Sequence, residues 1–166
     1  MRSGREMIWI TLLAGLVSSI AVQSAAPSAT SGRTLSADVA EVHTALTRFL
    51  VAFENLDWDA FRECFDDQAT VFFPSPEPGE RAEGRAAYEA RFRHVFDEIR
   101  RTEPSGPPFQ TLEPQDLRIE VFGPNGALVT FHLRNAERLA RRTIVFRKAD
   151  GRWRIFHLHA SNVPRQ

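Results

Sequence analysis

Histidines near the C-terminus are the residues of this sequence whose type and spacing best suit chemistry. His157 and His159 stand two positions apart at the end of the run Trp153 to His159, which is rich in aromatic and aliphatic residues. Side chains two apart on a strand share one face, so the pair could hold a metal ion, with His132 from a neighbouring strand as a third ligand. No acidic residue stands beside them to complete such a site. We therefore expect no metal or other cofactor, and we expect the pair to form hydrogen bonds on the outer face of a sheet; a catalytic imidazole is the alternative.

The other reactive side chains fit structural roles. Asp57 and Asp59 stand where a short helix should begin, and carboxylates two apart on a first turn point in different directions, so they do not form an acid–base pair. Cys64 is the sole cysteine and cannot form an intramolecular disulfide. Because it lies at helical spacing among aromatic residues, we expect a buried thiol.

Length and charge limit the class of protein. The chain has 166 residues, of which 43% are hydrophobic and 25% charged, so it can bury one good core. Its formal net charge is zero. Binding to nucleic acid without sequence preference needs a broad positive field, so we expect no nucleic-acid partner.

The N-terminal segment differs from the rest of the chain. Arg2 and Arg5 precede an apolar run from Met7 to about Ala21, and small residues follow up to Ala26. This pattern is typical of a secretory signal peptide cleaved between Ala21 and Ala26. An uncleaved anchor is the competing interpretation, but the run is shorter and less apolar than the roughly 20 residues of a spanning helix.

These features divide the chain into three parts. We predict a signal peptide over residues 1–26, a flexible linker over residues 27–34 that is rich in small residues, and one folded domain over residues 35–164. The mature protein is then secreted or periplasmic, with no membrane segment after cleavage.

Helices are predicted in the first part of the domain and strands in the second. Apolar residues recur at helical intervals over residues 36–55, 57–68 and 84–101, with Ser36 and Asp57 placed to cap the first two helices. One short strand, residues 69–73, lies between the second and third helices. After the proline-rich stretch near residue 106, the pattern changes to strands over residues 117–122, 127–134, 139–148 and 153–159.

The last two strands should form a hairpin, because Asp150-Gly151 between such runs is a strong turn signal. Helices followed by an antiparallel meander indicate an α+β fold, with the helices on one face of a curved sheet. The final hairpin is largely apolar on both sides. We therefore expect helices to cover one face of the sheet and a second subunit to cover the other.

These elements carry a resemblance to a known superfamily. The residues concerned are Ala69-Thr70-Val71 followed by Pro74, Gly84 opening the third helix, and the alternating ending from Asp150-Gly151 and Trp153 through His157 and His159 to Ser161. Together they resemble the SnoaL-like and nuclear transport factor 2-like superfamily, and the ending is most similar to the association (hub) domain of calcium/calmodulin-dependent protein kinase II. The resemblance covers roughly residues 38–164. It implies a cone-shaped curved sheet wrapped around three helices.

The resemblance also implies an apolar pocket between sheet and helices, and dimerisation through the outer face of the sheet. Hub-like alternation turns the two histidines outward, and Phe156 and Leu158 inward. The expected ligand-binding residues are Phe49, Phe53, Trp58, Phe73, Tyr88, Phe92, Phe131, Arg142, Ile144, Phe156 and Leu158. The expected partners are therefore a small, mostly apolar molecule and a second copy of the chain.

Steroid isomerases of this superfamily provide a test of catalysis. Their reaction needs a carboxylate base and two oxyanion donors in a dry pocket. The resemblance places these groups at Phe73, Phe49 and about Ile144, none of which can supply them. We expect that this chain is not a ketosteroid isomerase.

Three functions are compatible with the sequence. The first is an exported domain that binds a small apolar ligand without turning it over. The second is an enzyme, such as a lyase, hydrolase or cyclase, that acts on a small hydrophobic substrate through Tyr88, a histidine or Arg142. The third is an oligomerisation or interaction module. The superfamily includes all three kinds, so the fold by itself does not choose between them.

Overall fold

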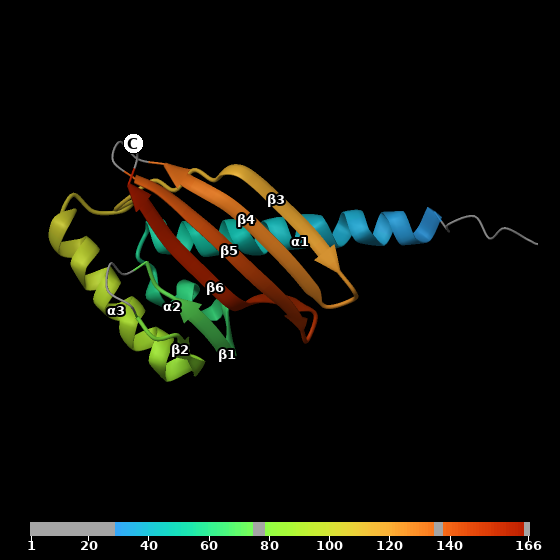
Figure 1. Cartoon of the computed structure of the whole chain (residues 1–166), viewed down its shortest axis with the longest axis horizontal. Helices are drawn as coiled ribbons and strands as arrows, with labels where there is room; N and C mark the ends of the chain where they lie inside the picture. Colours follow the sequence, from blue (N-terminus) through green and yellow to red (C-terminus); the bar gives the residue numbers. More distant parts are fainter. Residues whose placement is uncertain (1–28, 75–78, 135–137, 165–166) are drawn as a thin grey trace, which may run out of the picture.

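The part of the chain that the structure describes folds as a curled, open sheet of six strands with three helices on one face (Figure 1). The computed structural model describes residues 29–74, 79–134 and 138–164, so the predicted signal peptide lies outside the described residues. The helices are α1 (Ala29–Glu54), α2 (Trp58–Glu63) and α3 (Gly84–Thr102). The strands are β1 (Phe65–Phe72), β2 (Ala82–Glu83), β3 (Gln115–Phe122), β4 (Gly126–Arg134), β5 (Arg138–Ala149) and β6 (Arg152–Pro164). The α+β architecture predicted from the sequence is confirmed.

One strand pair departs from the predicted antiparallel sheet. The strand order is β2-β1-β6-β5-β4-β3, and β1 runs parallel to β6, whereas the other neighbours are antiparallel. The pairing of strands that follow one another in the chain, from β3 to β6, could be predicted from the turn residues between them. The partner of β1 lies far along the chain, so no local pattern in the sequence revealed this pair.

Helix α1 begins at Ala29, earlier than the predicted start at Ser36. Residues 29–34, which were predicted to belong to a linker, are therefore helical. The first turns of α1 extend beyond the sheet (Figure 1). Starting a helix is unfavourable because several residues are fixed for the first hydrogen bond, whereas extending it fixes only one residue for each further bond. A helix that packing stabilises further along the chain can therefore extend beyond its contacts with the sheet. No helix among the described residues is long and apolar enough to span a membrane.

An aromatic cluster joins the helices to the start of the sheet. The ring of Phe61 on α2 is fully buried. Its centroid lies 4.8 to 6.1 Å from six other aromatic rings, a separation that favours tilted and edge-to-face contacts. The six are Phe49, Phe53, Trp58, Phe65, Phe92 and Phe96. They come from α1, α2, β1 and α3, so this single cluster fixes how these elements pack.

Asp57 caps α2 as predicted, because its side chain accepts a hydrogen bond from the Ala60 backbone N–H at 3.1 Å. The predicted turn between β5 and β6 is also present. Asp150 and Gly151 have φ angles of 50° and 71°, and positive φ at both central residues is what a two-residue hairpin turn of type I′ requires.

A bulge in β6 decides which of its side chains face the helices. Adjacent residues of β5 pair with Ile155 and His157, so Phe156 has no residue opposite it. The alternation of the strand shifts at this point. As a result Ile155 and Leu158 are both buried, although they are an odd number of positions apart.

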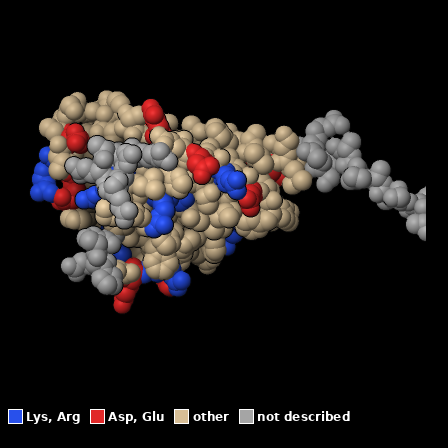
Figure 2. Space-filling view, turned by 45° about the horizontal axis from the view of Figure 1, so that its top comes forward, with Lys and Arg blue, Asp and Glu red and all other residues tan. Residues whose placement is uncertain are grey.

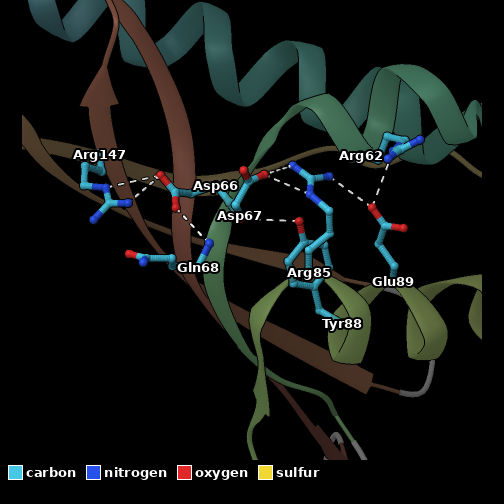
Figure 3. Close-up of polar contacts among 8 residues, drawn as sticks. All are labelled: Arg62, Asp66, Asp67, Gln68, Arg85, Tyr88, Glu89 and Arg147. Carbon is cyan, nitrogen blue, oxygen red and sulfur yellow. Dashed lines mark hydrogen bonds and ion pairs between the residues drawn. The ribbon is translucent and has the colours of Figure 1, made fainter.

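Charged side chains of β1, α3 and β5 form a connected network (Figure 3). The carboxylate of Asp66 accepts hydrogen bonds from Nη2 and Nε of Arg147, at 2.7 and 3.2 Å. On α3, Arg85 binds both Asp67, at 2.8 Å from its Nε, and Glu89, at 3.0 Å. The network therefore ties helix α3 and the C-terminal hairpin to the start of β1.

The carboxylate of Asp66 stabilises the fold in its charged form. Its side chain is 7% exposed. Burial acts to raise its pKa, but hydrogen bonds from the Arg147 guanidinium and the Gln68 backbone N–H outweigh burial, so the pKa lies below its ordinary value. A carboxyl group with a lowered pKa contributes stability above its unfolded pKa, and this contribution is lost as the pH falls through the folded pKa.

Charges of both signs are interspersed on the face that Figure 2 shows, and no continuous field of one sign is visible among the coloured residues. This distribution agrees with the formal net charge of zero.

The Asp66–Arg147 pair leads to a pH-dependent stability prediction. Arg147→Met leaves a buried carboxylate without its charged donor, so the free energy of unfolding at pH 7 should fall by about 1–3 kcal/mol. The difference from wild type should begin to shrink once the pH falls below about 3.9, the ordinary pKa of an Asp side chain, and it should be lost as the pH falls through the lower pKa of folded Asp66, because protonation removes the charge. Urea unfolding between pH 3 and 7 measures both effects.

The matched control is Arg101→Met. Arg101 forms an ion pair with Glu98 in which both side chains are well exposed, so its loss should change the stability by less than about 0.5 kcal/mol. Equal stability of Arg147→Met and Arg101→Met at pH 7 would show that the buried pair contributes nothing.

Candidate functional site

A cavity of about 220 Å³ lies between the helices and the sheet. Its walls come from α1, α3, the segment between α3 and β3, the segment after β1, and strands β1, β4, β5 and β6. The lining residues are Phe49, Leu50, Phe53, Val71, Phe73, Pro74, Phe92, Val95, Ile99, Gln110, Leu112, Phe131, Leu133, Arg142, Leu158 and Ala160. All except Gln110 and Arg142 are apolar.

Aromatic rings from three parts of the chain form much of the cavity wall. Phe73 and Phe92 lie 4.7 Å apart, and Phe49 and Phe53 lie 6.4 Å apart, measured between ring centroids. Each Å² of apolar ligand surface removed from water contributes about 25 cal/mol, so such a wall favours an apolar ligand body.

Arg142 brings a positive charge into this apolar lining. Its Nη1 donates to the carbonyl oxygen of Arg141 at 2.9 Å, and to the carbonyl oxygen of Ser161 and Oδ1 of Asn162 at 3.4 Å each. None of the ion pairs among the described residues includes Arg142. Burial lowers its pKa to about 10, so the guanidinium stays charged at neutral pH.

Gln110 enters the cavity wall from the segment between α3 and β3. Glu54, at the end of α1, holds that segment in place: its Oε1 accepts a hydrogen bond from the Leu112 N–H at 2.6 Å, and its carbonyl oxygen accepts one from the Phe109 N–H at 2.8 Å. The Nε2 of Gln110 is buried and has no hydrogen-bond partner among the described residues. A buried donor without a partner is unusual in a folded protein.

The structure brings together most of the residues predicted to bind a ligand. Seven of the eleven line the cavity: Phe49, Phe53, Phe73, Phe92, Phe131, Arg142 and Leu158. They come from α1, the segment after β1, α3, β4, β5 and β6. The superfamily resemblance, and not a local pattern of residues, is what grouped them in advance.

Two predicted residues on the helices lie elsewhere. Trp58 packs beside Phe61, with the guanidinium of Arg93 4.0 Å from the centroid of its ring. Tyr88 is fully buried and stacked on Phe65, at 5.0 Å between centroids. Its hydroxyl donates to the carbonyl oxygen of Asp66, and burial raises its pKa to about 12. Both therefore belong to the aromatic core and not to the cavity lining.

Two predicted residues on the strands also lie outside the lining. Ile144 is fully buried in the core but is not among the residues that reach the cavity. Phe156 occupies the bulge in β6, and the guanidinium of Arg147 lies 4.3 Å from the centroid of its ring. The prediction for Phe156 assumed unbroken alternation along β6, so the bulge makes it wrong.

Nine lining residues were not among the expected ligand-binding residues. Val95 and Ile99 belong to the apolar stripe of α3, and Leu50 to that of α1, so helical periodicity could have suggested them. Gln110 lies in a segment without periodicity, and no signal in the sequence pointed to it. The other five are Val71, Pro74, Leu112, Leu133 and Ala160.

Two of the positions to which the superfamily resemblance assigned reactive groups of a steroid isomerase are apolar residues of the cavity wall. Phe49 and Phe73 both line the cavity. No carboxylate, imidazole or thiol of the described residues reaches its wall. The described part of the lining therefore offers hydrogen-bond donors and apolar surface, but no general base.

The C-terminal histidines are not part of the cavity. His157 Nδ1 shares a hydrogen bond of 2.7 Å with the hydroxyl of Thr70 on the neighbouring strand, as predicted for a structural histidine. Burial, together with the charges of His159 and Arg81, lowers the pKa of His157. His132 lies on β4, which β5 separates from β6. Among the described residues, no group of three or more potential ligands is placed to hold a metal ion.

Comparisons with known proteins agree with this fold. Residues 42–166 match the family described as "SnoaL-like domain". A putative dehydratase of the NTF2-like family from Streptomyces avermitilis is 20% identical and superposes with a TM-score of 0.64, covering 77% of this chain and 97% of that one. The association domain of CaMKII from C. elegans is 18% identical, with a TM-score of 0.55, covering 77% of this chain and 98% of that one.

A third structure, an NTF2-like protein of unknown function from Pseudomonas putida KT2440, is 19% identical, with a TM-score of 0.62 over 76% of this chain and 87% of that one. The search of curated proteins found no match. At these identities the structural matches establish the fold and not a shared function. Because the family match spans most of the chain and the similar structures have the same architecture, the chain belongs to the SnoaL-like domain family and has the NTF2-like fold.

Proposed function

We propose that this chain is an exported domain that binds a small, mostly apolar molecule in the cavity between its helices and its sheet, without turning it over. The observation that supports this proposal is the composition of the lining, in which fourteen of sixteen residues are apolar. Concave sites with an apolar wall and a few placed polar groups are the common form of small-molecule sites.

The absence of a general base from the described lining favours binding over turnover. Proton abstraction beside a carbonyl needs a carboxylate or imidazole within hydrogen-bond reach of the substrate. The isomerase positions on the wall are occupied by Phe49 and Phe73, and Tyr88, the tyrosine considered for an enzyme, donates its hydroxyl to a backbone carbonyl in the core.

A cavity-filling variant tests the binding proposal. We expect small apolar compounds to raise the melting temperature of the wild-type protein, because a ligand at one hundred times its Kd adds about 2.7 kcal/mol to the stability of the native state. Ala160→Met adds side-chain volume at the cavity wall, so it should weaken this response at least tenfold. Thermal unfolding with a library of compounds small enough for the cavity measures the response.

Ala86→Met provides the control, because Ala86 is exposed on α3 and the added side chain extends into solvent. It should respond to ligands as the wild type does. Absence of stabilisation by any apolar compound in the wild type, or an unchanged response in Ala160→Met, would contradict binding in this cavity.

We also propose that two copies of the chain associate through the outer face of the sheet. The described helices lie on the opposite face (Figure 1). The outer face carries the partly exposed apolar side chains of Phe72 and Val145 beside His157 and His159. The similarity to a CaMKII association domain is compatible with assembly through this fold.

A charge on the outer face should separate the two copies. Val145→Arg places a guanidinium among the partly exposed apolar residues of the sheet, so the dimer dissociation constant should rise at least tenfold. Analytical ultracentrifugation over a concentration series measures it. Val51→Arg introduces the same side chain on the exposed side of α1, where Val51 is 49% exposed, and it should leave the dimer intact. A wild-type protein that stays monomeric at high concentration would refute the dimer.

Export is the third part of the proposal, and the pattern of residues 1–26 supports it. Expression of the full sequence in a bacterial host with a general secretion pathway should give a periplasmic protein whose N-terminus lies between residues 22 and 27. Leu12→Arg interrupts the apolar run and should keep the uncleaved protein in the cytoplasm, whereas Leu35→Arg, beyond the predicted cleavage region, should not. N-terminal sequencing of each fraction provides the readout; an uncleaved wild-type protein would disprove cleavage.

A further inference from the structure

We infer that the side chain of Gln110 selects the ligand of the cavity, and that this ligand is an uncharged molecule with an apolar body and an acceptor oxygen that carries no hydrogen, such as the oxygen of a ketone. Gln110 donates a hydrogen bond from Nε2 to this oxygen. The inference rests on the proposed binding function and names both the chemical class of the ligand and the residue that recognises it.

The first observation is a buried donor without an acceptor. The Nε2 of Gln110 is buried and forms no hydrogen bond with a described residue, and the side chain lines the cavity. An unpaired buried donor is unfavourable, because the group has lost its hydrogen bonds to water. A molecule in the cavity that presents an oxygen atom to Nε2 would remove this cost.

Water is a poor substitute for such a ligand. A buried water molecule typically forms about three hydrogen bonds, so it needs several polar partners. Among the described lining residues, only Gln110 and Arg142 have polar side chains. A water molecule at Nε2 would therefore find few side-chain partners, whereas the oxygen of a ketone has no hydrogen that needs an acceptor.

The second observation is that the main chain on both sides of Gln110 is held to the end of α1. The Phe109 N–H donates to the carbonyl oxygen of Glu54 at 2.8 Å, and the Leu112 N–H donates to Oε1 of Glu54 at 2.6 Å. Gln110 lies between these two anchored positions. A buried donor that is held in place discriminates against a ligand that lacks an acceptor, because the donor is then left unpaired.

The carboxylate of Glu54 also limits the charge of the ligand. Its Oε1 accepts from the N–H of Leu112, two residues after Gln110, so a negative charge lies beside the segment that carries the donor. An anionic group at Nε2 would lose its hydration near a charge of the same sign. An uncharged acceptor avoids this cost.

The rest of the described lining limits the polar atom and the size of the ligand. A hydroxyl group also donates, so its hydrogen would need an acceptor. The only side-chain oxygen among the described lining residues is Oε1 of Gln110 itself. An apolar cavity of about 150 Å³ can hold benzene. At about 220 Å³, this cavity therefore fits a ketone with a single aromatic ring.

Two compounds of nearly the same shape test the inference. Acetophenone carries an oxygen atom where α-methylstyrene carries a methylene group, and isothermal titration of the protein at pH 7.5 gives the ratio of their dissociation constants. Gln110→Met keeps the length of the side chain but removes its donor. It should change this ratio at least tenfold in favour of α-methylstyrene. The alcohol 1-phenylethanol should bind the wild type at least threefold more weakly than acetophenone.

Gln115→Met is the matched control, because Gln115 is an exposed residue of β3 outside the described lining, and it should keep the wild-type ratio. Glu54→Leu removes an acceptor that holds the segment of Gln110, so it should reduce the preference for the ketone at least threefold. Glu54→Gln retains an acceptor oxygen and should preserve the preference. A ratio that is the same in Gln110→Met and in the wild type would overturn the role of Gln110.

The outcomes separate this inference from the function on which it rests. If α-methylstyrene binds the wild type and acetophenone does not, the cavity binds apolar molecules but the inference is wrong. If neither compound binds, the proposed binding function itself fails.

A measurement on the wild type decides the inference if Gln110→Met does not fold. The side-chain N–H signals of Gln110 in the NMR spectrum should move downfield with acetophenone, as a new hydrogen bond requires, and not with α-methylstyrene. Equal shifts with both compounds would refute the hydrogen bond.

Discussion

The burial of Phe61 is the interaction on which the rest of this structure depends. Its ring is in contact range of aromatic residues from α1, β1 and α3 as well as from its own helix. Most of the stability of an amphipathic helix in a protein comes from packing its apolar face, and each of these elements contributes aromatic side chains to this cluster. The position of the helices relative to β1, and through β1 to the long hairpin of β5 and β6, follows from that packing.

The same packing explains why a cavity remains. Aromatic side chains fill the space between the helices and the start of β1, whereas the space near the end of β1 is enclosed by residues from separate helices, strands and connecting segments. Side chains from the curled sheet, the helices and the connecting segments surround this space but do not fill it, so a cavity remains. The resulting hollow is apolar because these positions belong to the apolar stripes and inward faces that also build the core.

The polar side chains at the start of β1 and those at the cavity differ in the partners that the folded chain gives them. At the start of β1 the acidic groups of the network meet opposite charges, as Asp66 does with Arg147 and Asp67 with Arg85. At the cavity the Nε2 of Gln110 has no acceptor among the described residues, and Arg142 donates only from Nη1, to uncharged oxygen atoms. In the first arrangement the folded chain supplies its own partners, and the buried carboxylate of Asp66 is held by the hydrogen bonds of Arg147. The second leaves groups whose partners must come from outside the described chain, which is the expected property of a binding site.

The sequence by itself determined the local elements and their order. Apolar periodicity predicted the helices, and residue types at single positions predicted the cap at Asp57 and the turn at Asp150-Gly151, because these features depend on residues within a few positions of one another. The superfamily resemblance grouped seven residues that line the cavity. Tertiary structure alone decided the parallel pairing of β1 with β6, the bulge at Phe156 and the placement of Gln110 in the cavity wall. Each of these features depends on contacts between segments that are distant in the chain. Such contacts produce no periodic pattern of residue types within either segment, so the sequence alone does not predict them.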